Sequence, residues 1–393
     1  MRIVPAPPSA FRAGCPAPFA LLDGHGRTLV RKGACLTERW QLNQLLSRGL
    51  WMHADDAHRF YRVAATGDPP SGQGGREVPA GASDPMDAKS PEYWQALCAR
   101  ADHLLRDPMS GSFLADLHRL HAELMQRLDE NPDLALFALT HLASISLRHY
   151  SATHALLCAA LLTVAAPTVP PWTTGDTTSL GLAALTMNVS ITVVHNAMAA
   201  QTRPPTSEQR AMIERHANGA TGVLQALGVQ DRQWLDAVLY HHDTGAGSLH
   251  PRQRGKHLAR FLRRADLYAA RLSPRLIRPA HSAAEAAQVA RLGDDLRPDE
   301  AGATIVDAVG LFPPGCYVRL VNGEIGCVVR RGDSATTPRV AVFACSEDSP
   351  MEAPITRDTV HSRFAIDFAF APRDVSVPMP FAALLDLAGS QAA

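Results

Sequence analysis

The chain has 393 residues, and its 38 Lys and Arg residues balance 38 Asp and Glu residues, so the formal net charge is zero. That balance argues against a protein that coats a nucleic acid polymer or an anionic membrane. Hydrophobic residues make up 46% of the chain and charged residues 19%, which is typical of folded domains rather than disordered chains. The length predicts two or three domains.

The cysteines and the apolar runs indicate the compartment. Seven cysteines are spread along the chain without a Cys-x-x-Cys pair, so a reducing compartment fits better than a disulfide framework. The N-terminal segment has no apolar signal core. The longest nearly apolar run, 155–166, is shorter than the ~18 residues that a membrane span needs. We therefore expect a cytoplasmic protein with no membrane span.

The first part of the chain, 1–63, predicts a small α+β module. Short apolar runs flank the Asp-Gly-His-Gly segment at 23–26, which indicates a hairpin. An amphipathic helix should follow, with Thr37 as its N-cap and Gly49 as its C-cap. Residues 64–91 are rich in Gly, Pro, Ser and Ala and have little to bury, so they predict a flexible linker.

Residues 92–310 show the apolar spacing of three and four that is typical of helices. The segment 113–128 is amphipathic, whereas 133–165 is apolar all round and predicts one or two buried helices. A further helix should begin with Ser207 as its cap and end at Gly228. The segments DRQWLDAVLYHH and KHLARFLRRADLYAARL predict two more helices.

The pattern changes to β structure in 311–372. Two β-rich runs flank Asn322-Gly323, a strong hairpin signal, and the segments 339–345 and 364–370 could add strands. The last segment, 373–393, is interpreted as a tail. We expect partial disorder to begin just before it, at Ala371. The fold class is therefore mainly α: a helical bundle flanked by an N-terminal α+β module and a short C-terminal β extension.

The helical block gathers residues that bind metals. They are His154, His195, His216, the adjacent pair His241-His242, and Asp266. Neutral imidazoles and carboxylates on rigid helices are suitable ligands for divalent metals. A single histidine on a helix is more often a structural side chain, so the order and spacing of these residues matter more than their number.

That order resembles the HD-GYP family, the branch of HD phosphohydrolases that hydrolyses cyclic di-GMP. Five segments stand in family order: YSATHALL, ERHANGATGVL, YHHDTGAGSLHP, RRADLYAARLSPRLIR and FPPGCYVRLVNGEIGCVV. The resemblance implies an HD-type helical bundle and the metal ligands His154, His216, His241, His242 and Asp266. In the second segment, His216 and Gly219 correspond to the His and Gly of the family's His-Pro-x-x-Gly helix. It also implies that Arg275 and Arg278 contact phosphate, since Arg suits bidentate phosphate binding.

The sequence departs from the family pattern at its name-giving residues. Met187 and Asn188 stand where the His-Asp pair is expected, and Ile191 stands where a phosphate-contacting lysine usually follows. The Gly-Tyr-Pro motif is reduced to residues 249–251, Leu-His-Pro. In the family the aspartate bridges two metal ions, and neither a neutral amide nor a soft thioether replaces it. We therefore expect the two-metal chemistry to be lost or severely weakened.

Two further features each allow two interpretations. His195 follows Met187 by eight residues and, on a continuous helix, could supply a substitute ligand, or it could be structural. A basic stretch precedes Asp266 and could either bind phosphate or form a solvated helix face. It comprises Arg252, Arg254, Lys256, Arg260, Arg263 and Arg264.

Three functions are compatible with these patterns. The first is a degenerate HD-GYP-like signalling protein that binds cyclic di-GMP or a partner protein without efficient turnover. The second is a metal-dependent cyclic di-GMP phosphodiesterase with a reduced site that holds one divalent ion, Fe or Mn. The third is a structural interaction module whose site is vestigial and binds no metal.

Overall fold

The computed structural model of the protein describes residues 3–5, 17, 19–22, 27–34, 51–53, 56, 87–169, 172–243, 249, 253–293, 296–346 and 349–390. Contacts between Cα atoms divide the chain into two units, Met1–Gly81 and Ala82–Ala393. The boundary between the units lies inside the segment 64–91, whose composition predicts a linker.

The N-terminal unit contains a small antiparallel sheet of strand order β1-β4-β2-β3. Its strands are β1 (Ile3–Pro5), β2 (Leu21–Leu22), β3 (Thr28–Val30) and β4 (Trp51–His53). Strands β2 and β3 pair with each other, as the hairpin prediction requires. Their connecting turn and the predicted helix with caps Thr37 and Gly49 lie outside the described residues.

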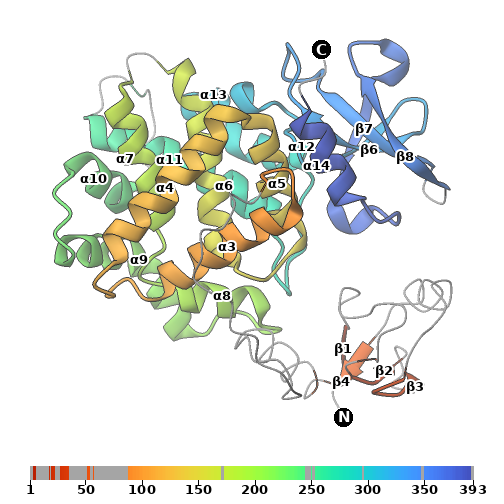
Figure 1. Cartoon of the computed structure of the whole chain (residues 1–393). Helices are drawn as coiled ribbons and strands as arrows, with labels where there is room; N and C mark the ends of the chain where they lie inside the picture. Colours follow the sequence, from red (N-terminus) through yellow and green to blue (C-terminus); the bar gives the residue numbers. More distant parts are fainter. Residues whose placement is uncertain are drawn as a thin grey trace. The chain divides into compact units, whose positions relative to one another are not determined.

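The second unit is mainly helical (Figure 1). Its helices before the β extension are α3 (Pro91–Arg106), α4 (Phe113–Glu130), α5 (Pro132–Ile145), α6 (Tyr150–Ala165), α7 (Thr174–Thr186), α8 (Thr192–Ala200), α9 (Ser207–Ala226), α10 (Arg232–Tyr240), α11 (Arg254–Leu272), α12 (Ala283–Arg291) and α13 (Glu300–Val309). The predicted helical block is confirmed, and the apolar segment 133–165 forms two helices, α5 and α6. The N-cap of α9 is Thr206 rather than Ser207, because the Thr206 hydroxyl accepts the Gln209 amide in a capping box.

Helix α6 lies at the centre of the bundle and packs against α3, α5, α7, α11 and α13. It is buried almost all round, which explains why its sequence shows no polar face. Among the described residues, the segment Tyr150–Thr168 alone has the length and hydropathy of a membrane span. However, 78% of its apolar window is buried inside the protein, as expected for a core helix.

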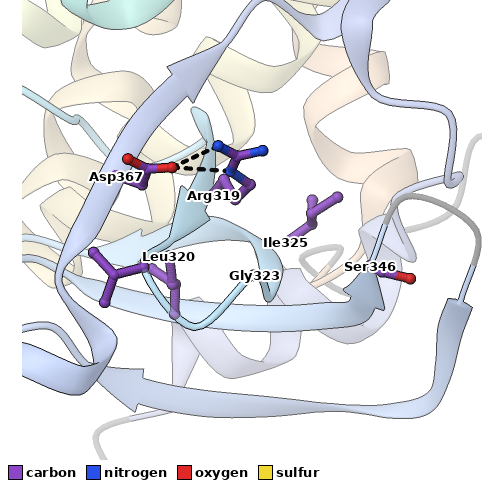
Figure 2. A pocket seen from close by; sticks show the side chains of 7 residues that line it. Arg319, Leu320, Gly323, Ile325, Ser346 and Asp367 are labelled. Atoms are coloured by element: carbon purple, nitrogen blue, oxygen red, sulfur yellow. Dashed lines mark hydrogen bonds and ion pairs between the residues drawn. The ribbon is translucent and has the colours of Figure 1, made fainter.

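The β extension forms a five-stranded antiparallel sheet of order β8-β7-β6-β5-β9. Its strands are β5 (Tyr317–Leu320), β6 (Ile325–Arg330), β7 (Arg339–Ser346), β8 (Ser349–Asp358) and β9 (Ile366–Phe370). The hairpin at Asn322-Gly323 is confirmed, and Gly323 has the positive φ of 90° that such a turn requires. The sheet carries a groove of about 400 Å³ (Figure 2), where both Arg319 Nε and Nη2 donate to Asp367 Oδ2 at 3.0 and 2.6 Å.

The prediction of a partly disordered tail is wrong for residues 371–390. Helix α14 (Phe381–Gly389) contacts both α5 and β6. Its Leu384, Leu385 and Ala388 are buried, and Asn131 donates to the carbonyl of Ala388. The tail therefore covers the junction between the helical bundle and the β extension.

A buried histidine gives the bundle a testable pH dependence. His121 on α4 is packed so closely against α7 that a methyl group on Gly181 would lie 2.5 Å from its Nε2. This nitrogen has no hydrogen-bond partner among the described residues. Burial, followed by the nearby His118, lowers the pKa of His121 from 6.5 to about 4.

Because the unfolded chain binds this proton more readily, His121 makes stability fall as the pH drops from 6.5 toward 4. The slope from one such group is at most about 1.4 kcal/mol per pH unit. We predict that His121→Leu flattens the pH dependence of the free energy of unfolding in this window, measured by urea titration. His103→Gln, at an exposed position on α3, is the control. Parallel curves for wild type and His121→Leu would contradict the prediction.

Candidate functional site

Three of the predicted ligands converge where the middle of α9 meets the C-terminal end of α10. His216 lies in α9, and His241 and His242 follow directly after the last residue of α10. Their ligand atoms all lie within 4.8 Å of one another. His216 Nε2 is 3.1 Å from His241 Nε2 and 3.3 Å from His242 Nε2. We call these three residues the histidine cluster.

Backbone carbonyls set the tautomers of two of these rings. His216 Nδ1 donates to the carbonyl of Ile213, and His241 Nδ1 donates to the carbonyl of Val238 at 2.7 Å. A carbonyl can only accept, so both protons sit on Nδ1 and each neutral ring has its lone pair on Nε2. Burial, followed by the charge of His242, lowers the pKa of His241 to about 3, so this ring is neutral at pH 7. An Nδ1–H bond to a carbonyl is typical of histidines that bind metals through Nε2.

His242 has the opposite tautomer in this structure. The Arg263 guanidinium lies 3.2 Å from its Nδ1, which must accept because guanidinium can only donate. The neutral ring therefore carries its proton on Nε2 and directs it at His216 Nε2. The Nε2 lone pair of His241 is thus ready to bind a cation, whereas His216 and His242 would join it once His242 has moved its proton to Nδ1.

A short turn holds the Met187-Asn188 pair beside α9. Helix α7 ends at Thr186 and α8 starts at Thr192, so His195 and Met187 are not on one continuous helix and the expectation that they share a face is wrong. Ser190 Oγ donates to the carbonyl of His216 at 3.0 Å. A methyl group on Gly219 would lie 3.0 Å from the same Oγ, so a small residue is needed there for the turn to approach α9.

The residues of this turn have become largely structural. Met187 is fully buried in the hydrophobic core, and Ile191 is 5% exposed. Asn188 is 8% exposed, and its backbone carbonyl accepts hydrogen bonds from the Ile191 amide and the Thr192 hydroxyl. The expected lysine position is therefore apolar, and only a small part of its side chain reaches the surface.

The other two predicted ligands pair with each other. His154 on α6 lies with its Nε2 2.9 Å from Asp266 Oδ1 on α11, while its buried Nδ1 has no described partner. Burial alone would raise the pKa of Asp266, but the hydrogen bond and charge of His154 and the charges of His241 and His242 outweigh it and lower that pKa. Asp266 is thus ionised at neutral pH and close enough to the histidine cluster to interact with it electrostatically.

His195 is engaged by other protein groups. Its Nε2 accepts from Arg275 Nη2 at 3.2 Å, and its Nδ1 lies 3.3 Å from Ser151 Oγ. Burial, followed by the charges of His154 and Arg275, holds the pKa of His195 well below its usual value. Because the guanidinium occupies the lone pair of Nε2, this structure gives His195 a positioning role rather than that of a substitute ligand.

The two arginines expected to bind phosphate have internal partners. Arg275 Nε donates to Tyr150 Oη at 3.2 Å, and its guanidinium stacks 5.5 Å from the Tyr150 ring. Arg278 Nη2 donates to the carbonyls of Ala270 and Ser273 at the end of α11. In this conformation these donors fasten the segment after α11 to the bundle.

Several described residues of the basic stretch before Asp266 have partners inside the protein. Arg260 and Arg264 are buried and both form ion pairs with Asp299, which also caps α13. Lys256 lies over the Tyr240 ring at 4.8 Å, and Arg254 pairs with Asp176. Arg252 lies outside the described residues. The charges of α11 mainly connect it to its neighbours.

An open groove borders the histidine cluster and was not predicted from the sequence. It has a volume of about 310 Å³ and lies between α9 and the turn before α8. His216 and Ile191 line it, together with the exposed side chains of Glu208, Met212 and Arg215. Glu208, Met212 and Arg215 are spaced by four and then three residues, which places them on one face of α9. This spacing could have indicated a shared surface, but the three residues match no known motif.

The donor set fits one divalent cation. Two Nε2 lone pairs 3.1 Å apart repel each other, and a cation between imidazoles relieves this repulsion. An ionised carboxylate, Asp266, lies nearby for charge balance. The set does not fit two cations, because the position expected to bridge them holds the neutral amide of Asn188.

No protein-family model matches the sequence. The chain is 29% identical over 282 residues to the cyclic di-GMP phosphodiesterase PA4108 of Pseudomonas aeruginosa, covering 68% of this chain and 66% of that protein, slightly less than two thirds of its length. Among solved structures, the HDG"Y"P protein Bd1817 from Bdellovibrio bacteriovorus aligns at a TM-score of 0.40 and 14% identity, over 77% of this chain and 98% of that chain. Such a loose alignment adds no weight.

The sequence relative and the ordered segments point the same way. The five segments occur in family order, and the structure brings the histidines of two of them into one cluster. The chain is therefore similar to a cyclic di-GMP phosphodiesterase over about two thirds of its length, and it resembles HD-GYP proteins in the order of these segments.

The contact between Gly219 and Ser190 can be tested by a pair of alanine substitutions in α9. A helix usually gains about 1 kcal/mol when an interior glycine becomes alanine. We predict that gain for Gly222→Ala, where a methyl group meets nothing within 4 Å. Gly219→Ala should gain nothing or lose stability, because its methyl group displaces Ser190. Equal gains in urea unfolding would show that the turn does not depend on this contact.

Proposed function

We propose that the protein is a signalling member of the HD-GYP family that binds cyclic di-GMP and hydrolyses it slowly or not at all. The observation that carries this proposal is the pairing of an intact histidine cluster with Asn188 at the bridging position. The cluster retains a cation-binding donor set, whereas the anion that would hold a second cation is missing. The relative in Pseudomonas aeruginosa, a cyclic di-GMP phosphodiesterase, supports the choice of ligand.

The roles of the residues follow from their contacts. His216, His241 and, after its proton shift, His242 would hold one divalent ion, Fe or Mn, which would supply positive charge to a phosphate of the ligand. Asp266 balances that charge and keeps His154 in place through the 2.9 Å bond. Asn188 can donate or accept a hydrogen bond but contributes no negative charge. Recognition of the phosphodiester is therefore supported better than its cleavage.

A reduced but active phosphodiesterase is the second candidate. The observation in its favour is the ionised Asp266 paired with His154 beside the histidine cluster. A proton could leave or reach that pair during hydrolysis. The missing charge at position 188 and the internal partners of Arg275 and Arg278 favour the binding function instead.

Turnover measurements separate the two candidates. With Mn²⁺ or Fe²⁺ supplied, we predict that the wild-type chain binds cyclic di-GMP in calorimetry but completes fewer than one turnover per site in an hour-long assay of linear product. Asn188→Asp restores a carboxylate of the same shape and should raise the rate at least tenfold. Asn322→Asp, in the distant β5–β6 hairpin, should leave it unchanged.

Repeated turnover by the wild-type chain would support the second candidate and contradict the first. A wild-type chain that binds no cyclic di-GMP, with or without metal, would contradict both and favour an interaction module.

A further inference from the structure

We infer that the groove between α9 and the turn before α8 is the nucleotide-binding subsite, with Arg215 contacting a phosphate and Glu208 reading the edge of a guanine base. This inference rests on the proposed function and specifies how the ligand is recognised. It assigns recognition to α9 instead of to the segment that contains Arg275 and Arg278.

The groove adjoins the histidine cluster, because the two share one residue. His216 lines the groove and also belongs to the cluster, and Arg215 precedes it in the chain. A phosphate held by Arg215 would thus lie close to the cation that the cluster is suited to bind. Arg is well adapted to such a contact because its guanidinium can donate two parallel hydrogen bonds to phosphate oxygens.

The charges of the groove are available for a ligand. Neither Glu208 nor Arg215 forms an ion pair or a side-chain hydrogen bond with any residue that the structure describes. In the larger groove of the β extension, by contrast, Asp367 holds Arg319 through two hydrogen bonds (Figure 2). Arg275 and Arg278 are likewise occupied.

The shape and lining of the groove suit one nucleotide. Its volume of about 310 Å³ is at the lower end of small-molecule pockets, so it could take half of a cyclic dinucleotide. Ile191, Ala211 and Met212 provide an apolar surface on which a base can lie. Glu208 and Arg215 are two helical turns apart, about 10 Å along the axis, which separates the base edge from the phosphate.

Glu208 gives the groove a preference among bases. An ionised carboxylate only accepts hydrogen bonds, and the Watson–Crick edge of guanine presents two adjacent N–H donors, the ring N1–H and the exocyclic amino group. Adenine presents an acceptor at N1, which would repel the carboxylate. The groove should therefore prefer cyclic di-GMP over cyclic di-AMP.

The test uses the full chain and calorimetric titration with both cyclic dinucleotides, with the metal content of each sample measured alongside. Arg215→Ala should weaken cyclic di-GMP binding at least tenfold without changing the metal content, and Arg215→Lys should recover part of the loss. Glu208→Gln should reduce the preference for cyclic di-GMP over cyclic di-AMP at least fivefold. Arg210→Ala and Glu214→Gln, on the same helix but outside the groove lining, are the matched controls.

The outcomes distinguish this inference from the proposed function. If the wild-type chain binds cyclic di-GMP and both groove variants bind it like the controls, the subsite is wrong while the proposed function stands. Loss of metal from Arg215→Ala would also overturn the inference, because the residue would then act through His216. If the wild-type chain binds neither dinucleotide, the proposed function fails and the subsite fails with it.

Discussion

Two imidazole nitrogens that face each other without a proton between them define this site. His216 and His241 each donate the Nδ1 proton to a carbonyl of their own helix, and their Nε2 atoms lie 3.1 Å apart. Such a pair is unfavourable unless a cation lies between the nitrogens, so the fold stabilises an arrangement whose electrostatics call for a positive charge. The remaining features of the site either support this arrangement or limit what it can do.

What the site can do is limited by residues whose side chains are buried or bound to other protein groups. Met187 is part of the core, Ile191 is buried at the end of the turn before α8, and neither side chain carries a charge. Arg275 bridges Tyr150 and His195, so a side chain expected to face a ligand instead fastens α6, α8 and the segment after α11 together. The histidine cluster thus presents cation-binding nitrogens, while the side chains expected to hold phosphate have partners inside the protein. This combination is the basis for our proposal that the protein binds a nucleotide rather than consuming it.

Much of the fold could be predicted because it depends on local patterns. The helical block ends at Val309 as expected, and Asn322-Gly323 forms its hairpin, since helix periodicity and turn chemistry are encoded within a few residues. Helix α14 was missed because it is short, and its buried face depends on α5 and β6, which are distant in sequence. Strand β8 was missed because it lies at the edge of the sheet, where its residues are mostly exposed and show no apolar alternation.

The sequence indicated which residues belong to the site but not which side chains they pair with. The histidines were identified by order and spacing, whereas the pairing of His154 with Asp266 and the internal bonds of Arg278 depend on side-chain directions that no motif specifies. The groove at Arg215 escaped notice because exposed charges on a helix ordinarily face solvent, and only the neighbouring turn makes this stripe part of a concave surface.

The number of metal ions per chain tests the central claim most directly. The full chain would be saturated with Mn²⁺ or Fe²⁺, freed of excess metal, and analysed for metal and protein content, with His241→Ala as the reference. Our account predicts one ion per wild-type chain and the loss of that ion in His241→Ala. Two tightly held ions per wild-type chain would contradict it.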